Sequence, residues 1–293
     1  MDEAKLGFIG GSGLYDMDGL ADREELDIET PFGPPSDSIV AGIISGTRVA
    51  FLPRHGRGHR IPPTQIPVRA NIYALKTLGV ERIVSVSAVG SLREELSPMD
   101  LVVPDQLLDR TTGRPSTFFE DGIVAHVGFA DPFCPTLSQI LVQAAKRQGV
   151  VTHQGGTYVV MEGPQFSTRA ESKLYRSWGA DIIGMTGLPE AKLAREAEIC
   201  YATMALVTDY DCWHEAEDSV SVELIVANLA KNAAAAKGVI ADLATKVPVA
   251  RGCVCASALH DAIITAPDQV PRETLKRLSP IVDKYLSIKQ EVN

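Results

Sequence analysis

The chain has 293 residues, of which 45% are hydrophobic and 22% charged, and its formal net charge is −9. This is the composition of an ordinary globular protein with a sizeable core, and the acidic balance argues against a general binder of nucleic acid or of membrane surfaces. No apolar run reaches the roughly 18 residues of a spanning helix. The acidic start MDEAKLGFIGG is unlike a signal peptide, so a cytoplasmic protein is expected.

Strand-like apolar runs alternate with helix-like stretches along the chain. Strands are expected over residues 5–9, 38–44, 48–52, 82–89, 156–161, 181–185 and 201–208. Helices are expected over residues 68–78, 136–147, 168–178, 189–198, 220–245 and 272–288. Ser45-Gly46 between two strands indicates a hairpin. Strands separated by helices predict a mainly parallel sheet covered on both faces, in which ligands bind beyond the carboxyl ends of strands.

The first strand runs into a glycine-rich turn, Gly10-Gly11-Ser12-Gly13. The dinucleotide pattern G-x-G-x-x-G fails there, because its sixth position counted from Gly11 is Asp16. A triphosphate-binding loop needs Gly-Lys-Ser or Gly-Lys-Thr, which the chain lacks. A dinucleotide-binding dehydrogenase or a nucleotide sensor is therefore disfavoured. A small oxyanion bound by backbone amides and Ser12 remains, beside the alternative of a tight structural turn.

Polar residues also follow several of the later strands. The segment 53–60, PRHGRGHR, places three arginines and two histidines in an otherwise acidic protein, and guanidinium groups suit phosphate oxygens. Small hydroxyl residues follow two further strands, in the segment 87–91 and at Thr186. Each of these is also compatible with a helix-capping turn. Together with the glycine-rich turn they predict one oxyanion site.

Two carboxylates, Asp209 and Asp211, follow the strand expected over 201–208. They would lie on the same side if the strand continued, because side chains two residues apart share a face. A carboxylic acid at a strand end can protonate a leaving group if its pKa is raised. The alternative is a helix cap or a solvated turn.

The cysteine count is odd, which does not suit a secreted disulfide framework. The five are Cys134, Cys200, Cys212, Cys253 and Cys255. The first three are expected to be small buried hydrophobes. Cys253 and Cys255 could pair or bind a soft metal, but two incidental reduced thiols are the favoured interpretation. No metal site is expected, since a helix that presents both His55 and His59 is doubtful among so many glycines.

Specific segments in this order resemble the purine nucleoside phosphorylase family, in particular its branch that acts on 5′-methylthioadenosine. The resemblance covers about residues 5–245 and is carried by GFIGGSGLY, LPRHGRGHRIPPTQIPVRANIYALKTLGV, SAVGSLREELSPMDLVVPDQLLDRT, ADPFCP, VVMEGPQFSTRAES, GMTGLPEAKLAREAEICYA and VTDYDCW. It implies an α/β three-layer sandwich around a mixed, partly barrel-like sheet. It also implies one domain over 1–293, with a helical tail over about 248–293, assembled as a homotrimer or hexamer.

The resemblance implies a reaction of purine and methionine salvage. Phosphate attacks C1′ of methylthioadenosine and releases adenine and 5-methylthioribose 1-phosphate, with orthophosphate as co-substrate and no cofactor. Asp209 would face purine N7 as the acid, with a pKa raised by a dry pocket, and Asp211 would bind the exocyclic amine. Two carboxylates favour 6-amino over 6-oxo purines. A purine nucleoside or 5′-methylthioinosine phosphorylase is the alternative, and a nucleosidase would not need the phosphate residues.

The remaining site residues are assigned by the same resemblance. Phosphate would be held by Ser12, Arg54, His55, Ser87, Ala88 and Thr186, and substrate by Phe166 near the base, Met185 against the ribose, Tyr210, and His126, which resembles the histidine that closes the 5′ pocket of a neighbouring subunit. Ser167 and Val222 match positions that affect specificity. Gly184 stands where eukaryotic members have Asn. The tail that contains Cys253 and Cys255 looks more like prokaryotic members, some of which pair such cysteines.

Overall fold

A computed structural model of the chain describes residues 3–11, 14, 17, 19–214 and 222–286, and within α5 the side chains of 222–225 and 229 are outside this description. The strands are β1 (Leu6–Gly10), β2 (Ala21–Leu26), β3 (Ile39–Ile44), β4 (Thr47–Pro53), β5 (Arg82–Ser91), β6 (Leu101–Val103), β7 (Gln106–Arg110), β8 (Thr152–Gln154), β9 (Thr157–Met161), β10 (Ile182–Gly184) and β11 (Cys200–Asp209). The α-helices are α1 (Val68–Thr77), α2 (Pro135–Arg147), α3 (Arg169–Ser177), α4 (Glu190–Glu196), α5 (Val222–Ala244), α6 (Arg272–Arg277) and α7 (Ser279–Val282). Short 3₁₀ turns cover Pro63–Gln65, Val254–Ser257 and Pro267–Gln269.

The strands form one mixed sheet that branches at β5. Its main path is β2-β3-β4-β1-β5-β10-β9-β7, while β11 pairs with β5 and with β6, and β6 pairs with β8. The strands β4, β1, β5 and β11 are parallel to one another, whereas β10 runs antiparallel to β5. The family resemblance implied a mixed, partly barrel-like sheet, and this branched mixed sheet agrees with that expectation. The antiparallel pair β3–β4 confirms the hairpin predicted at Ser45-Gly46, whereas the expectation of a mainly parallel sheet missed the antiparallel pairs at β2–β3, β5–β10 and β6–β11.

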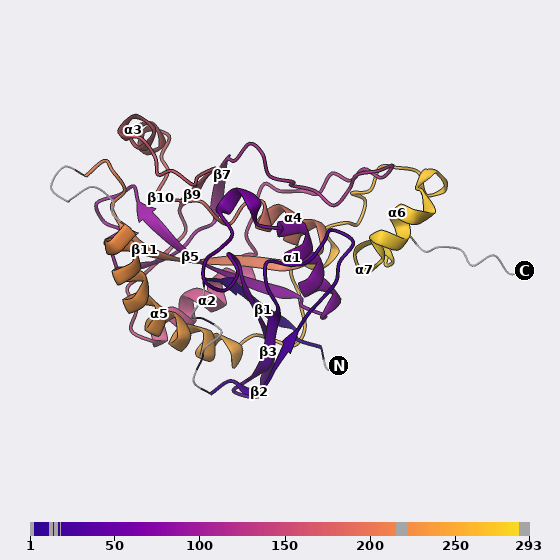
Figure 1. Ribbon diagram of the computed structural model, residues 1–293, viewed down its shortest axis with the longest axis horizontal. Helices are drawn as coiled ribbons and strands as arrows, with labels where there is room; N and C mark the ends of the chain where they lie inside the picture. Colours follow the sequence, from indigo (N-terminus) through magenta and orange to yellow (C-terminus); the bar gives the residue numbers. More distant parts are fainter. Residues whose placement is uncertain (1–2, 12–13, 15–16, 18, 215–221, 287–293) are drawn as a thin grey trace, which may run out of the picture.

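Helices cover both faces of the sheet, which gives the three layers that the sequence predicted. On one face α2 and α5 pack together against β11, and on the other α1 packs beside α4 (Figure 1). Alternate residues of β11 enter the two cores. One core takes Cys200, Ala202, Met204 and Leu206, and the other takes Tyr201, Ala205 and Val207. This strict alternation, with all ten residues of β11 buried, is why its sequence is apolar nearly throughout.

Local sequence explains where several elements begin and end. Ser45 and Gly46 have φ of 48° and 82°, so both adopt the left-handed conformation of a tight hairpin turn between β3 and β4. Gly79, with φ of 82°, follows the last residues of α1. The helix α3 begins with a capping box, in which Thr168 and Glu171 each bind the other's backbone N–H.

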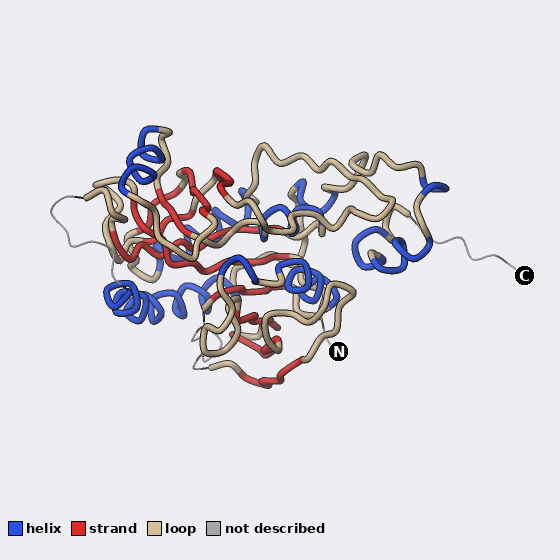
Figure 2. Tube along the Cα trace, turned by 45° about the horizontal axis from the view of Figure 1, so that its top comes forward, coloured by secondary structure: helices blue, strands red, loops and turns tan. Residues whose placement is uncertain are grey.

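The helix expected over 272–288 is wrong for its described part. The chain forms two short helices there, α6 and α7, with Leu278 as the boundary residue of both. Pro280 lies in the first turn of α7, where its missing N–H costs nothing but prevents a continuous helix through this point. These helices lie at the end of the molecule remote from α3, next to the long loops that run over the sheet (Figure 2).

Candidate active site

The carboxyl ends of β1, β4, β5 and β11 meet at one edge of the sheet. Gly10 at the end of β1 is in register with Pro53 at the end of β4, and the Arg54 N–H donates to the Gly10 carbonyl at 2.9 Å. At the end of β11, Asp209 is in register with Gly90 of β5. Ligands bind at this edge in open α/β sheets. The pairing of the strands therefore brings the predicted site residues to the edge where a ligand would bind.

Asp209 and Asp211 are held together by a turn rather than by a continued strand. The strand ends at Asp209, after a bulge at Thr208, and Asp211 has a φ of 50°. The Asp211 N–H donates to Asp209 Oδ1 at 2.8 Å, and the Thr208 hydroxyl donates to Asp209 Oδ2 at 2.7 Å. The carboxylates are therefore close, as predicted, but for a different structural reason. Asp209 is only 5% exposed.

Gly90 makes room for the Asp209 carboxylate. A Cβ at position 90 would lie 2.9 Å from Asp209 Oδ1 and 3.4 Å from Asp211 Cβ. A side chain at position 90 would displace the Asp209 oxygen that accepts from the Asp211 N–H, so the glycine serves the close approach of this carboxylate.

Asp211 has a second partner from a distant part of the chain. The Ser167 hydroxyl lies 2.8 and 2.9 Å from the two Asp211 oxygens and is shared between them. Ser167 directly precedes the capping box of α3, which fixes its position. Burial raises the pKa of Asp211, and the hydroxyls of Ser172 and Ser167 oppose that rise. Ser167, predicted as a specificity position, thus acts on the carboxylate predicted to bind the purine amine.

Ser87 lies within β5 rather than after it as the sequence had predicted, and its hydroxyl meets that of Thr186, which follows β10. The Thr186 hydroxyl donates to Ser87 Oγ at 2.8 Å, and Ser85 Oγ lies 3.5 Å from Ser87 Oγ. The antiparallel run of β10 along β5 causes this meeting, because it turns the residues after Gly184 back toward Ser87. Ala88 is the next residue of β5. Ser12, the third predicted hydroxyl, lies outside the described residues.

Arg54 is buried and bound to protein groups. Its side chain is 2% exposed and binds both oxygens of Glu190, at 2.5 and 3.2 Å, with Ile9 O, Val86 O and Ser85 Oγ as further acceptors. Arg54 therefore has little capacity left for phosphate oxygens, and its structural role is to join β1, β5 and α4 beneath the hydroxyl pair.

His55 is a neutral imidazole. Its Nδ1 lies 2.8 Å from the Ile61 carbonyl, which can only accept, so Nδ1 carries the proton and Nε2 is left as an acceptor. Burial lowers the pKa of His55 to about 4, helped by the positive charge of Arg54. The ring stacks on His59 in an irregular turn, with ring centres 4.2 Å apart.

We expect His55 to make stability depend on pH. Its pKa is about 4 in the folded chain and 6.5 in the unfolded chain, so the unfolded state binds more protons between these values and stability rises with pH across that window. His55→Asn keeps a donor for the Ile61 carbonyl but does not titrate. Thermal unfolding at pH 5 and pH 7 should therefore show a larger loss at low pH for the parent than for the variant. Equal losses would contradict the assignment.

The sequence did not point to three buried residues that position the site. One is Glu190, the partner of Arg54, and the other two are Asn228 and Asn232 of α5. Asn228 Nδ2 donates to the Thr208 carbonyl at 2.8 Å, and Asn232 Nδ2 donates to the Val207 carbonyl at 3.3 Å, so α5 fixes the end of β11 that carries Asp209. The two asparagines lie four residues apart in an otherwise apolar helix. This spacing places both on one face, so it could have indicated a shared buried role.

The remaining predicted residues lie around or away from this cluster. Phe166 is 46% exposed. The Met185 side chain lies against Gly163, where an added Cβ would meet Met185 Sδ at 2.5 Å. The Tyr210 hydroxyl lies 3.2 Å from the Glu94 carbonyl and 3.1 Å from Ser97 Oγ. The Val222 side chain is outside the described residues.

His126 is bound to the C-terminal segment of its own chain. Its N–H donates to the Ala262 carbonyl at 2.9 Å, and the preceding Ala125 forms a bridge with Ile263. The loop therefore lies beside the segment that leads into α6 and α7, and these helices lie at the end of the molecule remote from α3 (Figure 1).

Gly184 is explained by its neighbour Tyr158. A Cβ at position 184 would lie 2.6 Å from the hydroxyl oxygen of Tyr158, a fully buried side chain. The space that an asparagine side chain would need is therefore filled by this tyrosine.

Surface hollows elsewhere on the chain do not include these residues. Hollows of about 570 and 380 Å³ lie on the side of the C-terminal segment. The first is lined by Pro31, Tyr73, Asp121, Glu273, Thr274, Lys276 and Arg277, and the second by Gly128, Arg195, Val254, Ser257, Ala258 and His260. The candidate site is recognised instead by its converging carboxylates and hydroxyls.

Such a site, at the branched sheet of an α/β sandwich, is what a phosphorolytic enzyme requires, and comparison with known proteins agrees. The model of the phosphorylase superfamily matches residues 5–245, so the chain belongs to this superfamily.

No helix among the described residues is both long and apolar enough to cross a membrane.

Within the superfamily, the chain is similar to several S-methyl-5′-thioadenosine phosphorylases. It is 57% identical over 97% of its length to the S-methyl-5′-thioadenosine phosphorylase of Geobacter sulfurreducens, covering all of that protein. It is 58% identical to the same enzyme of Koribacter versatilis, with 97% of each chain covered. A methylthioadenosine phosphorylase from an antarctic soil metagenomic library matches with a TM-score of 0.91 and 53% identity, covering 96% of this chain and 99% of that one. The Schistosoma mansoni enzyme in complex with adenine matches with a TM-score of 0.79 and 38% identity, over 83% and 91% of the two chains.

Proposed function

We propose that the chain catalyses phosphorolysis of 5′-methylthioadenosine to adenine and 5-methylthioribose 1-phosphate, in purine and methionine salvage. The observation that carries this proposal is the pair of buried carboxylates at the end of β11, linked through the Asp211 N–H and facing the same sheet edge as the Ser87–Thr186 hydroxyl pair. The names of the relatives support the same substrate.

The carboxylates account for the purine half of the reaction. A phosphate oxygen bonds to C1′ as the C1′–N9 bond breaks, and the electron pair of that bond enters the purine. Asp209 in its protonated form gives its proton to N7 and so disperses the developing negative charge. Asp211 accepts a hydrogen bond from the exocyclic amine. A 6-oxo purine would place an acceptor against this carboxylate, which costs roughly 1–3 kcal/mol for a mispaired buried group.

Phosphate is bound by hydroxyls, an imidazole and backbone amides in this proposal. Ser87 and Thr186 donate to phosphate oxygens once their mutual hydrogen bond opens, and Ser12 and the Ala88 amide complete the contacts. His55 Nε2 accepts from a protonated phosphate oxygen, since its Nδ1 proton is engaged by Ile61. Arg54 supplies positive charge next to the hydroxyl pair, and Glu190 fixes the orientation of its guanidinium through Nε and Nη2. Phosphate both attacks C1′ and stabilises the positive charge on the ribose.

The test is an assay with methylthioadenosine, adenosine and 5′-methylthioinosine, with and without phosphate. We expect release of adenine that requires phosphate and produces 5-methylthioribose 1-phosphate. Release without phosphate would identify a nucleosidase. A preference for methylthioinosine would identify the 6-oxo alternative.

Thr186 gives a matched pair of variants for the phosphate contacts. Thr186→Val removes the hydroxyl but keeps the shape, so we expect the phosphate KM to rise roughly 10- to 100-fold, as a lost hydrogen bond to a charged group costs roughly 1.5–3 kcal/mol. Thr186→Ser keeps the hydroxyl and should stay near the parent. Steady-state kinetics with phosphate varied at saturating nucleoside measures both. Equal phosphate KM values for Thr186→Val and Thr186→Ser would show that phosphate does not contact the Thr186 hydroxyl.

A homotrimer or a hexamer is part of the proposal, as are a single domain over residues 1–293 and a cytoplasmic location. His126 supports assembly, because the family resemblance assigns it to the 5′ pocket of a neighbouring subunit, and in its own chain its N–H is bound to the C-terminal segment at Ala262. Native mass spectrometry tests the assembly, and a monomer with full activity would contradict the role of His126.

A further inference from the structure

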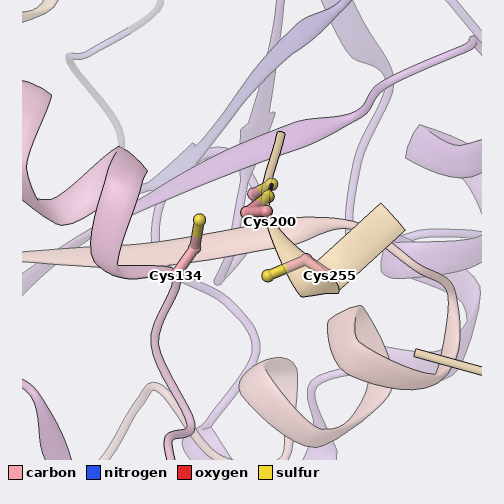
Figure 3. Close-up of side chains that lie close together, drawn as sticks. Cys134, Cys200 and Cys255 are labelled. Atoms are coloured by element: carbon pink, nitrogen blue, oxygen red, sulfur yellow. Dashed lines mark hydrogen bonds between the residues drawn. The ribbon is translucent and has the colours of Figure 1, made fainter. Parts of the chain in front are cut away.

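Four of the five cysteines converge on one point in the fold. The sulfurs of Cys134, Cys200, Cys253 and Cys255 all lie within 4.8 Å of one another, and all but Cys253 are buried. Figure 3 shows the side chains of Cys134, Cys200 and Cys255 pointing toward one another from separate segments. The expectation of incidental thiols treated these residues one by one and missed the cluster.

The three segments are fixed to one another by the surrounding structure. The Cys134 N–H donates to the Tyr201 carbonyl at 2.8 Å, which ties the residue before α2 to the start of β11. Cys200 is the first residue of β11. Cys253 and Cys255 flank the start of the 3₁₀ turn Val254–Ser257, and Cys200 Sγ lies 3.3 Å from Cys253 Sγ. The cluster thus joins the C-terminal tail to the centre of the sheet.

The spacing of the sulfurs suits a tetrahedral ion. With metal–sulfur bonds of about 2.3 Å, a tetrahedral zinc ion holds its four sulfurs about 3.8 Å apart. The contacts of 3.3 Å and below 4.8 Å bracket this value. Among the described residues the group contains sulfur donors only, and a set of four thiolates selects a soft or borderline ion such as zinc over magnesium or calcium.

The four sulfurs are not joined as disulfides in the structure. The cysteines are free, and the Cys200–Cys253 contact of 3.3 Å is longer than the roughly 2.05 Å of an S–S bond. The cluster therefore presents four separate sulfur donors, which is the form that a metal ion binds.

We propose that Cys134, Cys200, Cys253 and Cys255 bind one zinc ion per chain, and that this ion fastens the C-terminal tail to β11. Binding displaces the thiol protons to solvent and oxidises nothing. Beyond the cluster, the Leu259 N–H donates to Glu198 Oε1, and the Ala262 carbonyl accepts from His126. The ion therefore anchors the segment against which the His126 loop is built.

The test measures metal directly and does not depend on activity. Protein purified in reducing buffer with zinc supplied and then desalted should contain one zinc per chain by inductively coupled plasma mass spectrometry. The double variant Cys253→Ser/Cys255→Ser should contain none, and Cys212→Ser, which alters the cysteine outside the cluster, should keep its zinc. Chelation should lower the unfolding temperature of the parent and of Cys212→Ser.

A second measurement decides the matter if the double variant does not fold. Parent protein stripped of metal and loaded with cobalt(II) should show the intense visible bands of a tetrahedral ion and a thiolate charge-transfer band. Parent protein that binds neither zinc nor cobalt overturns the proposal. So does intact mass after rapid alkylation, without reductant, that reveals two disulfides among these four cysteines.

Discussion

Replacing Asp209 by asparagine should abolish most of the release of adenine from methylthioadenosine while sparing 6-oxo substrates. The asparagine amide cannot give up a proton to N7, and a positioned general acid contributes roughly 10²- to 10⁴-fold to a rate. An amide can, however, donate to both N7 and O6 of a 6-oxo purine. We therefore expect kcat/KM for methylthioadenosine to fall by about 10²-fold or more, with a much smaller loss, or a gain, for 5′-methylthioinosine.

The fold tolerates this change, so the result can be assigned to chemistry. In Asp209→Asn the amide oxygen would still accept the Asp211 N–H, and the Thr208 hydroxyl can rotate to accept from the amide nitrogen. Asp211→Asn is the comparison, and it should act mainly on the KM for adenine nucleosides, since Asp211 is proposed to bind rather than to protonate. Equal losses on both substrates in Asp209→Asn would contradict the selectivity argument.

Replacing Glu190 by alanine should cost the protein about 3–5 kcal/mol of stability, the usual effect of breaking a buried ion pair. Glu190 is 2% exposed and accepts from Arg54 Nε at 2.5 Å and from the Tyr201 hydroxyl at 2.8 Å. Without it, the Arg54 charge is left in the core without a counter-ion. Urea unfolding measures the loss, and phosphate binding should weaken as well because the guanidinium loses its orientation.

A double variant separates the structural part of this pair from its part in phosphate binding. Arg54→Met/Glu190→Leu replaces both charges by apolar groups of similar size, which often restores the stability lost in single variants. We expect it to regain most of the stability of the parent but to bind phosphate poorly. A double variant with normal phosphate KM would show that Arg54 is purely structural.

The sequence predicted the elements whose signals are local. The Ser45-Gly46 turn and the glycine after α1 carry their own backbone requirement, and the apolar run of β11 reports burial on both faces. The strands β2, β6, β7 and β8 were missed because they are short or polar and are defined by their partners. The prediction of one helix over 272–288 was wrong because the apolar spacing of the sequence continues across Pro280, where the chain begins a second helix.

The candidate site was predicted as a set of residues but not as a set of contacts. Asp209, Ser87 and Thr186 were found because the sequence places them at or near the carboxyl ends of predicted strands. The carboxyl ends of parallel strands lie at one edge of a sheet. The partners that shape them come from elsewhere in the sequence. Glu190 is 136 residues from Arg54, and Ser167 is 44 residues from Asp211. The meeting of the cysteines is likewise a property of the packed chain.

The branch at β5 has a consequence for how the protein is made. β5 pairs with β1 on one side, but its other side waits for β11, which comes much later in the chain. While the ribosome makes the intervening segment, this central edge is unpaired and open to wrong partners. Only when Cys200–Asp209 emerges does the edge close, and the same event delivers Asp209. Completion of the sheet and arrival of the proposed catalytic acid are thus one step of synthesis.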